Sequence, residues 1–148
     1  MIFMCKNLQI LIGGIEVAAQ LMKELPEFET PYSLQEMNER MSGHTYLNLI
    51  AYLDGKPVGF KLGYVQDACF YSWLGGVLPN YRRMGIAKKL AESQEGWVRK
   101  NGYTTVIFKT RNKHKAMLLF ALNNGFNIFK IESKEDVEEY RIWMKKNI

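Results

Sequence analysis

Residues 77–88 read VLPNYRRMGIAK and contain the most informative pattern in the chain. An apolar strand end leads into a helix with four cations between Arg82 and Lys89, before the first acidic residue, Glu92. The N-terminus of a helix carries partial positive charge and unpaired N–H groups, so these cations are unfavourable there unless an anion lies among them. Gly85 and Ala87 have little or no side chain and would let a bulky anion approach the backbone. The segment therefore predicts a phosphate or pyrophosphate site.

The spacing R-x-x-G-x-A over residues 82–87, preceded by Val77 and Pro79, closely resembles the acyl-coenzyme A signature of the GNAT superfamily of N-acetyltransferases. A second block follows in the order and at the separation found in that superfamily, where an Asn opens a helix and a Gly-Phe pair closes it. It consists of Asn112, Ala116, Phe120 and the pair Gly125-Phe126. The chain lacks the dinucleotide fingerprint G-x-G-x-x-G.

The resemblance implies acetyl-coenzyme A as a co-substrate and assigns a set of cofactor-binding residues. They are Val77, Arg82, Arg83, Met84, Gly85, Ile86, Ala87, Lys88, Asn112 and Phe120. In the family picture, backbone N–H groups of residues 83–88 bind the pyrophosphate, and backbone groups of Val77 contact the pantetheine arm. An N–H group near Val77 would polarise the thioester carbonyl. Asn112 is also a natural helix N-cap, and capping alone would explain it.

Two positions depart from the family pattern. Many relatives have a Tyr at the position of Phe120, where it protonates the leaving thiolate, and Phe has no proton to donate. Some relatives place a general-base Glu six residues before the Val of the signature, where this chain has Tyr71. A thiol with a pKa near 8.5 is already a tolerable leaving group. No catalytic residue is therefore assigned, and the amine would lose its proton through water or Tyr71.

Composition indicates an ordinary globular chain. Its 148 residues fit one domain, residues 1–148, with 47% hydrophobic and 24% charged residues. Cys5 and Cys69 lie in apolar strand-like contexts without metal-ligand spacing, so we expect reduced core thiols, no metal and a cytoplasmic location. No segment resembles a signal peptide or a membrane span, so no membrane partner is expected.

The net charge of +5 is compatible with nucleic acid as a partner. However, much of the basic excess lies in residues 82–89 and 109–115, at two predicted helix starts, whereas nucleic-acid-binding faces usually form an extended stripe. Two compact clusters suit a small phosphorylated ligand better, so no nucleic acid is expected.

Hydrophobic periodicity and turn signals predict four helices and seven strands. The expected strands are 2–12, 46–53, 57–65, 68–77, 103–108, 126–132 and 139–144. The expected helices begin after Gly13-Gly14, at the capping box of Ser33 and Glu36, after Pro79 and at Asn112. The last helix is apolar almost all round and is expected to be packed on most sides. The fold class is mixed α/β, with a mostly antiparallel sheet of about seven strands, and the resemblance places the cofactor cleft between strands four and five.

The leading functional hypothesis is transfer of an acetyl group from acetyl-coenzyme A to a primary amine of a small molecule, by direct attack in a ternary complex. Residues 16–39 contain six Glu and one Lys, which would attract a cationic acceptor if they line the site. They could equally be the solvated faces of two helices. The alternatives are an acyl-coenzyme A sensor without turnover and a basic nucleic-acid-binding domain. The resemblance also allows a homodimer formed through the late strands.

Overall fold

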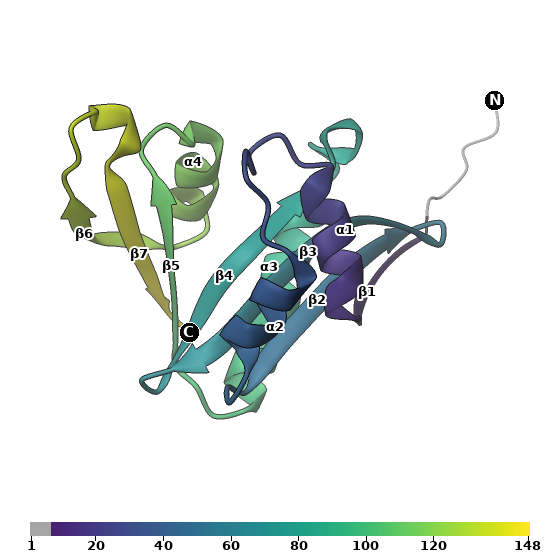
Figure 1. The fold of residues 1–148 in the computed structure, drawn as a ribbon. Coiled ribbons are helices and arrows are strands. Elements are labelled where there is room, and N and C mark those ends of the chain that lie inside the picture. Colours follow the sequence, from purple (N-terminus) through teal and green to yellow (C-terminus); the bar gives the residue numbers. More distant parts are fainter. Residues whose placement is uncertain (1–6) are drawn as a thin grey trace.

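The computed structural model describes residues 7–148, which form one seven-stranded sheet with helices on both faces (Figure 1). The strands are β1 (Leu8–Ile12), β2 (Tyr46–Leu53), β3 (Lys56–Gln66), β4 (Cys69–Val77), β5 (Thr105–Arg111), β6 (Asn127–Glu132) and β7 (Arg141–Asn147). The helices are α1 (Ile15–Lys23), α2 (Leu34–Met41), α3 (Ile86–Lys100) and α4 (Lys115–Asn123). Short 3₁₀ turns occupy Pro79–Tyr81 and Val137–Glu139. The predicted α/β fold class is confirmed.

The strand order is β1-β2-β3-β4-β5-β7-β6, and β4 with β5 is the parallel pair. All other neighbours are antiparallel. The β2–β3 hairpin turns at Asp54 and Gly55, which both have positive φ, as a two-residue hairpin turn requires. Strand β5 follows β4 through α3, because parallel neighbours need a crossover connection.

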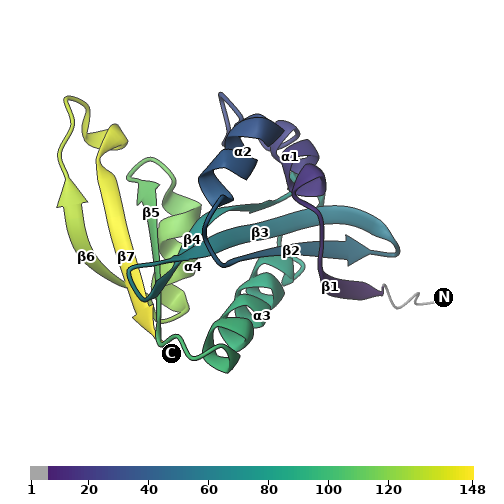
Figure 2. The same ribbon diagram turned by 60° about the horizontal axis from the view of Figure 1, so that its bottom comes forward.

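Two hydrophobic layers enclose the sheet. On one face α1 and α2 pack over β3 and β4, with Met22, Met37 and Phe60 fully buried. On the other face α3 packs through Leu90 and Val98 against Leu47 and Val106. Figure 2 shows α1 and α2 on one side of the sheet and α3 on the other. Side chains of β4 are buried in both layers, which fixes the position of this strand.

Local sequence signals explain the element boundaries. The Ser33 side chain accepts a hydrogen bond from the Glu36 N–H, and the Glu36 carboxylate accepts one from the Ser33 N–H, so the predicted capping box is confirmed. Helix α3 ends at Lys100 with Asn101 as its C-cap, and Gly102 follows at φ 86°, as predicted. The predicted strand 2–12 begins at Leu8 within the described residues, and its earlier part, with Cys5, lies outside them.

The predictions for α4 were wrong in two respects. His114 is its N-cap, not Asn112, because the chain at 112–114 is bound to the turn before β7. The helix is also not packed on most sides, because Ala121 is its one buried residue, and Leu119 and Leu122 are exposed. It lies near the end of the sheet, where only a narrow row of its side chains packs against β5 and β7. The prediction from its apolar composition therefore gave this helix more burial than it has.

Among the residues that the structure describes, no helix is long and apolar enough to cross a membrane. Nor do any three His, Cys, Asp or Glu residues in the described range approach one another as a metal site requires. Cys69 is a partly buried free thiol.

Candidate active site

The sheet opens between β4 and β5. The two strands pair only at Phe70 with Val106 and at Tyr71 with Ile107. Beyond these pairs, residues 72–77 of β4 have no partner on β5, and the strands diverge visibly in Figure 1. The opposite edges of both strands are fully paired, with β3 and β7. Beyond the two pairs, the facing edges of β4 and β5 are not paired with each other, and we refer to this opening of the sheet as the cleft.

A β-bulge in β4 accompanies this opening. Ser72 pairs with Gly63 and Leu74 with Leu62, so Trp73 is the extra residue. A bulge bends and twists its strand, which here turns β4 away from β5. Because the free edge of a strand can hydrogen-bond an extended chain, this part of β4 can bind an amide-containing arm.

The segment after β4 leaves its backbone open where the sequence predicts an anion site. Gly85 has φ 78°, and a Cβ built on it would meet nothing within 4 Å. Arg83 also has positive φ. Among the described residues, no acceptor takes a hydrogen bond from the backbone N–H groups of residues 83–88. The first turn of α3 has no acidic residue. A pyrophosphate would satisfy these N–H groups and the dipole of α3 together.

The Arg82 side chain is bonded to other groups of the protein. Its Nε donates a hydrogen bond to the Val77 carbonyl at 2.9 Å, and its guanidinium forms an ion pair with Glu27. One of the four cations at the helix start therefore has a partner within the protein. The remaining cations, Arg83, Lys88 and Lys89, are exposed and form no ion pair with a described residue.

Asn112 lies on the other side of the cleft. Its Nδ2 donates a hydrogen bond to the Val137 carbonyl at 3.1 Å, and its Oδ1 accepts one from the Lys115 ammonium at 2.8 Å. The Asn112 N–H donates to the Tyr140 carbonyl. These bonds attach the β5–α4 connection to the turn before β7, and this structural role was not foreseen from the sequence.

A small cavity separates α3 from α4 on the face of the sheet opposite α1. Phe120 and Phe108 line it from one side, and Lys61 and Gln94 from the other. Gln94 is buried, and its Nε2 has no acceptor among the described residues. Burial lowers the pKa of Lys61 to about 8, while Glu95 opposes the shift. The sequence signal for Lys61 was a lysine within the otherwise apolar alternation of β3.

Aromatic side chains cover the cleft on the α1–α2 face. The Tyr71 ring lies 5.4 Å from Tyr64, edge to face, and Trp73 lies 5.1 Å from Tyr32. Burial raises the pKa of the Tyr71 hydroxyl far above its usual value, and Tyr64 adds to the rise. Arg40 opposes it. A phenol in this environment is a poor base near neutral pH.

The comparisons with known proteins agree with this geometry. Residues 15–126 match the model of the acetyltransferase (GNAT) family. The chain belongs to the GNAT family. The match covers both signature blocks and the first two helices.

Solved structures share the GNAT fold along nearly the whole chain. The ribosomal-protein-S18-alanine N-acetyltransferase from Escherichia coli has 22% identity and a TM-score of 0.82, over 96% of this chain and 94% of that one. Ard1 from Thermoplasma volcanium has 16% identity and a TM-score of 0.82, over 95% of this chain and 97% of that one. The PaiA N-acetyltransferase of Thermoplasma acidophilum, solved with coenzyme A, has 18% identity and a TM-score of 0.74, over 96% of this chain and 99% of that one. No curated protein matches the chain.

Proposed function

We propose that this GNAT protein transfers an acetyl group from acetyl-coenzyme A to a primary amine. One observation carries the proposal: six consecutive backbone N–H groups, in residues 83–88, have no acceptor among the described residues, and they follow the end of β4 that does not pair with β5. A pyrophosphate bound there would place the pantetheine arm along the free edge of β4. The GNAT structures solved with coenzyme A or acetyl-coenzyme A support this choice of ligand.

In this reaction the amine attacks the thioester carbon directly, the C–S bond breaks, and coenzyme A leaves as a thiolate. The enzyme holds both reactants in the cleft, and this proximity provides much of the rate. An N–H group on the unpaired edge of β4 would stabilise the negative charge that develops on the carbonyl oxygen. The amine loses its proton to water, because the Tyr71 phenol is a poor base and Phe120 cannot exchange a proton.

Thiol release with a panel of primary amines tests the proposal. The rate is expected to rise with pH toward the pKa of the amine, because no enzyme base is assigned. A plateau near neutral pH would reveal an enzyme base and contradict the proposed proton route.

The alternative is an acyl-coenzyme A sensor without turnover, favoured by the absence of a Tyr at position 120. Saturable acetyl-coenzyme A binding without thiol release across the panel would support the sensor. Steady release with any amine excludes it.

A further inference from the structure

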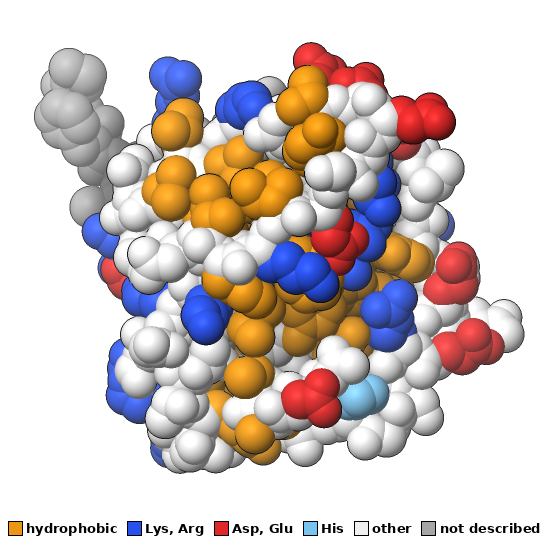
Figure 3. All heavy atoms as spheres, turned by 90° about the vertical axis from the view of Figure 1, so that its left-hand side faces the viewer, with side chains coloured by type: hydrophobic (Ala, Val, Ile, Leu, Met, Phe, Trp, Pro, Cys, Tyr) orange, Lys and Arg blue, Asp and Glu red, His pale blue; other side chains and the backbone are white. Residues whose placement is uncertain are grey.

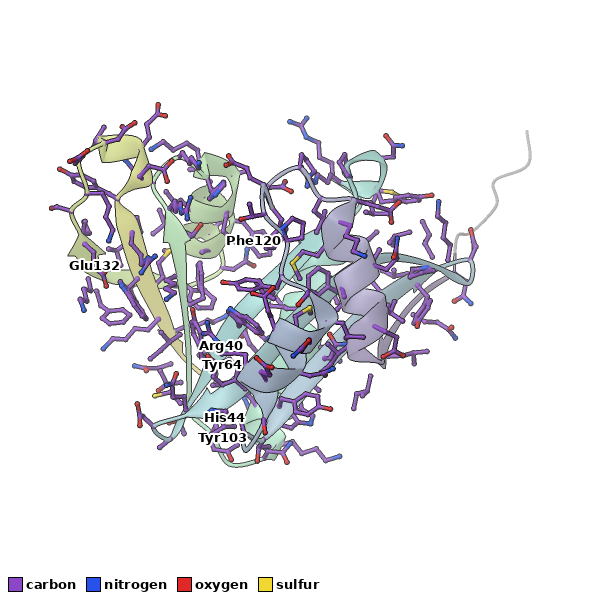
Figure 4. All side chains as sticks on the ribbon, viewed as in Figure 1. Arg40, His44, Tyr64, Tyr103, Phe120 and Glu132 are labelled. Atoms are coloured by element: carbon purple, nitrogen blue, oxygen red, sulfur yellow. The ribbon has the colours of Figure 1, made fainter. Side chains whose placement is uncertain are left out.

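The side of the cleft that faces α2 carries a group of basic side chains. They are Arg40 of α2, Lys109 of β5 and Arg141 of β7, and we refer to them as the cation cluster. The Arg40 guanidinium lies 4.9 Å from the Trp73 ring centroid and donates a hydrogen bond to the Tyr64 hydroxyl at 3.4 Å. Figure 4 shows Arg40 and Tyr64 close together where α2 approaches the opening of the sheet.

Lys109 extends the cation cluster across the cleft from the β5 side. Its Nζ lies 6.0 Å from the Tyr71 ring centroid and 5.1 Å from that of Trp143. Burial lowers the pKa of Lys109, and the charges of Arg141 and Arg40 lower it further. Arg40 and Arg141 are therefore near enough for their charges to act on Lys109, and Glu132 opposes their effect. Figure 3 shows hydrophobic side chains gathered in the middle of the face at the β6–β7 end, with Lys and Arg side chains among them.

Acidic side chains balance this charge only in part. Glu132 lies 3.8 Å from Arg141, but it also lies 3.7 Å from Lys130 and accepts a hydrogen bond from the Trp143 indole. Among the described residues, neither Arg40 nor Lys109 has a carboxylate within 4 Å. Like charges held together on a partly buried aromatic surface favour an anion from outside the protein.

Four of the six acidic residues predicted to attract a cationic acceptor have partners within the protein. Glu27 pairs with Arg82, Glu29 with Lys113, and Glu36 caps its own helix. Glu39 accepts a hydrogen bond from Gln35. The charged groups next to the Trp73 and Tyr71 rings, Arg40 and Lys109, are thus positive.

We propose that the acceptor amine carries a carboxylate, which binds between Arg40 and Lys109 over the rings of Tyr71 and Trp73. This inference rests on the proposed acetyl transfer and specifies its acceptor. A carboxylate is planar and matches the donor geometry of a guanidinium. The aromatic rings would pack against the carbon skeleton that joins the carboxylate to the amine.

Matched acceptors test the proposal. Thiol release is compared for 5-aminopentanoate against pentylamine, and for L-amino acids against their amides, at saturating acetyl-coenzyme A. We expect kcat/KM at least tenfold higher for the member with a carboxylate. Equal rates, or faster reaction of the members without a carboxylate, would overturn the inference while leaving acetyl transfer intact. A stronger preference for phosphoethanolamine would also overturn it, because the cation cluster would then select phosphate.

Single substitutions test whether Arg40 and Lys109 cause the preference for carboxylate acceptors. Arg40→Gln and Lys109→Gln should each raise KM for carboxylate acceptors at least tenfold and leave KM for pentylamine and the Kd of acetyl-coenzyme A unchanged. Arg99→Gln, an exposed change in the last turn of α3, is the matched control and should alter none of them. Equal losses for both acceptor classes would contradict a role in carboxylate binding.

A binding measurement keeps the inference testable without turnover. Trp73 and Trp143 lie beside the cation cluster, so an acceptor bound there should change their fluorescence. In the presence of coenzyme A, titration with the carboxylate acceptors should saturate, and titration with their amides should not. If thiol release fails but this difference appears, the proposed transfer is wrong and the carboxylate site stands. If both titrations behave alike, the carboxylate site is wrong.

Discussion

Glu27 and Glu29, two residues apart in the loop between α1 and α2, form ion pairs with opposite sides of the cleft. Glu27 pairs with Arg82 at the start of α3, and the Glu29 carboxylate lies 3.6 Å from the ammonium of Lys113 on the β5 side. Lys113 also pairs with Glu139 at 2.8 Å, and this pairing raises the lysine pKa and lowers that of Glu139. The loop thus connects the two sides of the opening and brings negative charge close to the proposed phosphate site.

Replacing Glu27 by Gln should strengthen acetyl-coenzyme A binding several-fold. The change frees the Arg82 guanidinium and removes a negative charge that would repel the phosphates. The cost in stability should be below about 1 kcal/mol, because exposed ion pairs contribute little. Calorimetric Kd values for the wild type and the variant check the effect, with Glu24→Gln as the control, an exposed acid without an ion pair among the described residues. Weaker binding by Glu27→Gln would show that the ion pair instead organises the site.

Replacing Gly85 by Val should abolish the rise in melting temperature that acetyl-coenzyme A produces. The side chain would occupy the open space over the backbone where the pyrophosphate is expected. Val at φ 78° is also strained by about 1–2 kcal/mol. Gly102→Val is a matched control at the other end of α3, because Gly102 has φ 86° and equally open space. Both variants should lose similar stability, and only Gly102→Val should keep the ligand-induced shift. A normal shift for Gly85→Val would refute the pyrophosphate assignment.

Tyr71→Phe should keep kcat within about threefold of the wild type. The raised pKa keeps the Tyr71 hydroxyl protonated, so its removal deletes no base. The ring, which contributes to the acceptor face, stays in place. Steady-state kinetics across pH 6 to 9 check this. A loss of a hundredfold or more, with a changed pH profile, would identify Tyr71 as a proton-transfer group after all.

Lys61→Met should stabilise the protein most at neutral pH and lose this advantage as the pH rises. The folded-state pKa of Lys61, about 8, lies below its ordinary value of 10.5, so the unfolded state binds more protons between these values. The penalty for burying the charge is fully present below pH 8, amounts to at most about 3 kcal/mol, and is relieved toward pH 10.5. Urea unfolding of both proteins at pH 7 and pH 10 measures the difference. A difference that does not change with pH would show that Lys61 retains an ordinary pKa in the folded state.

Much of the fold follows from local signals that the sequence contains. The capping box at Ser33, the Asp54-Gly55 turn and the C-cap at Gly102 each involve residues close in the sequence, so pattern reading located them. The junction between β4 and α3 was likewise predicted from residues 77–88, because the positive φ at Gly85 depends on the residue itself and not on distant contacts. The assignment of this segment to the cofactor remains a prediction.

The wrong predictions depended on contacts distant in the sequence. Asn112 is not the cap of α4, because hydrogen bonds to Val137 and Tyr140 hold its segment outside the helix. The exposure of Leu119 depends on where the sheet ends, which its own helix cannot indicate. The cation cluster combines residues 40, 109 and 141, and no spacing in the sequence connects them. The proposed carboxylate site therefore could not be predicted from the sequence.

Calorimetric titration of the wild-type protein with acetyl-coenzyme A tests the central claim most directly, because every assignment around residues 77–88 depends on that ligand. The account predicts saturable binding with one site per chain. The absence of binding would mean that the unpaired N–H groups of residues 83–88 serve no coenzyme, and it would contradict the proposed function.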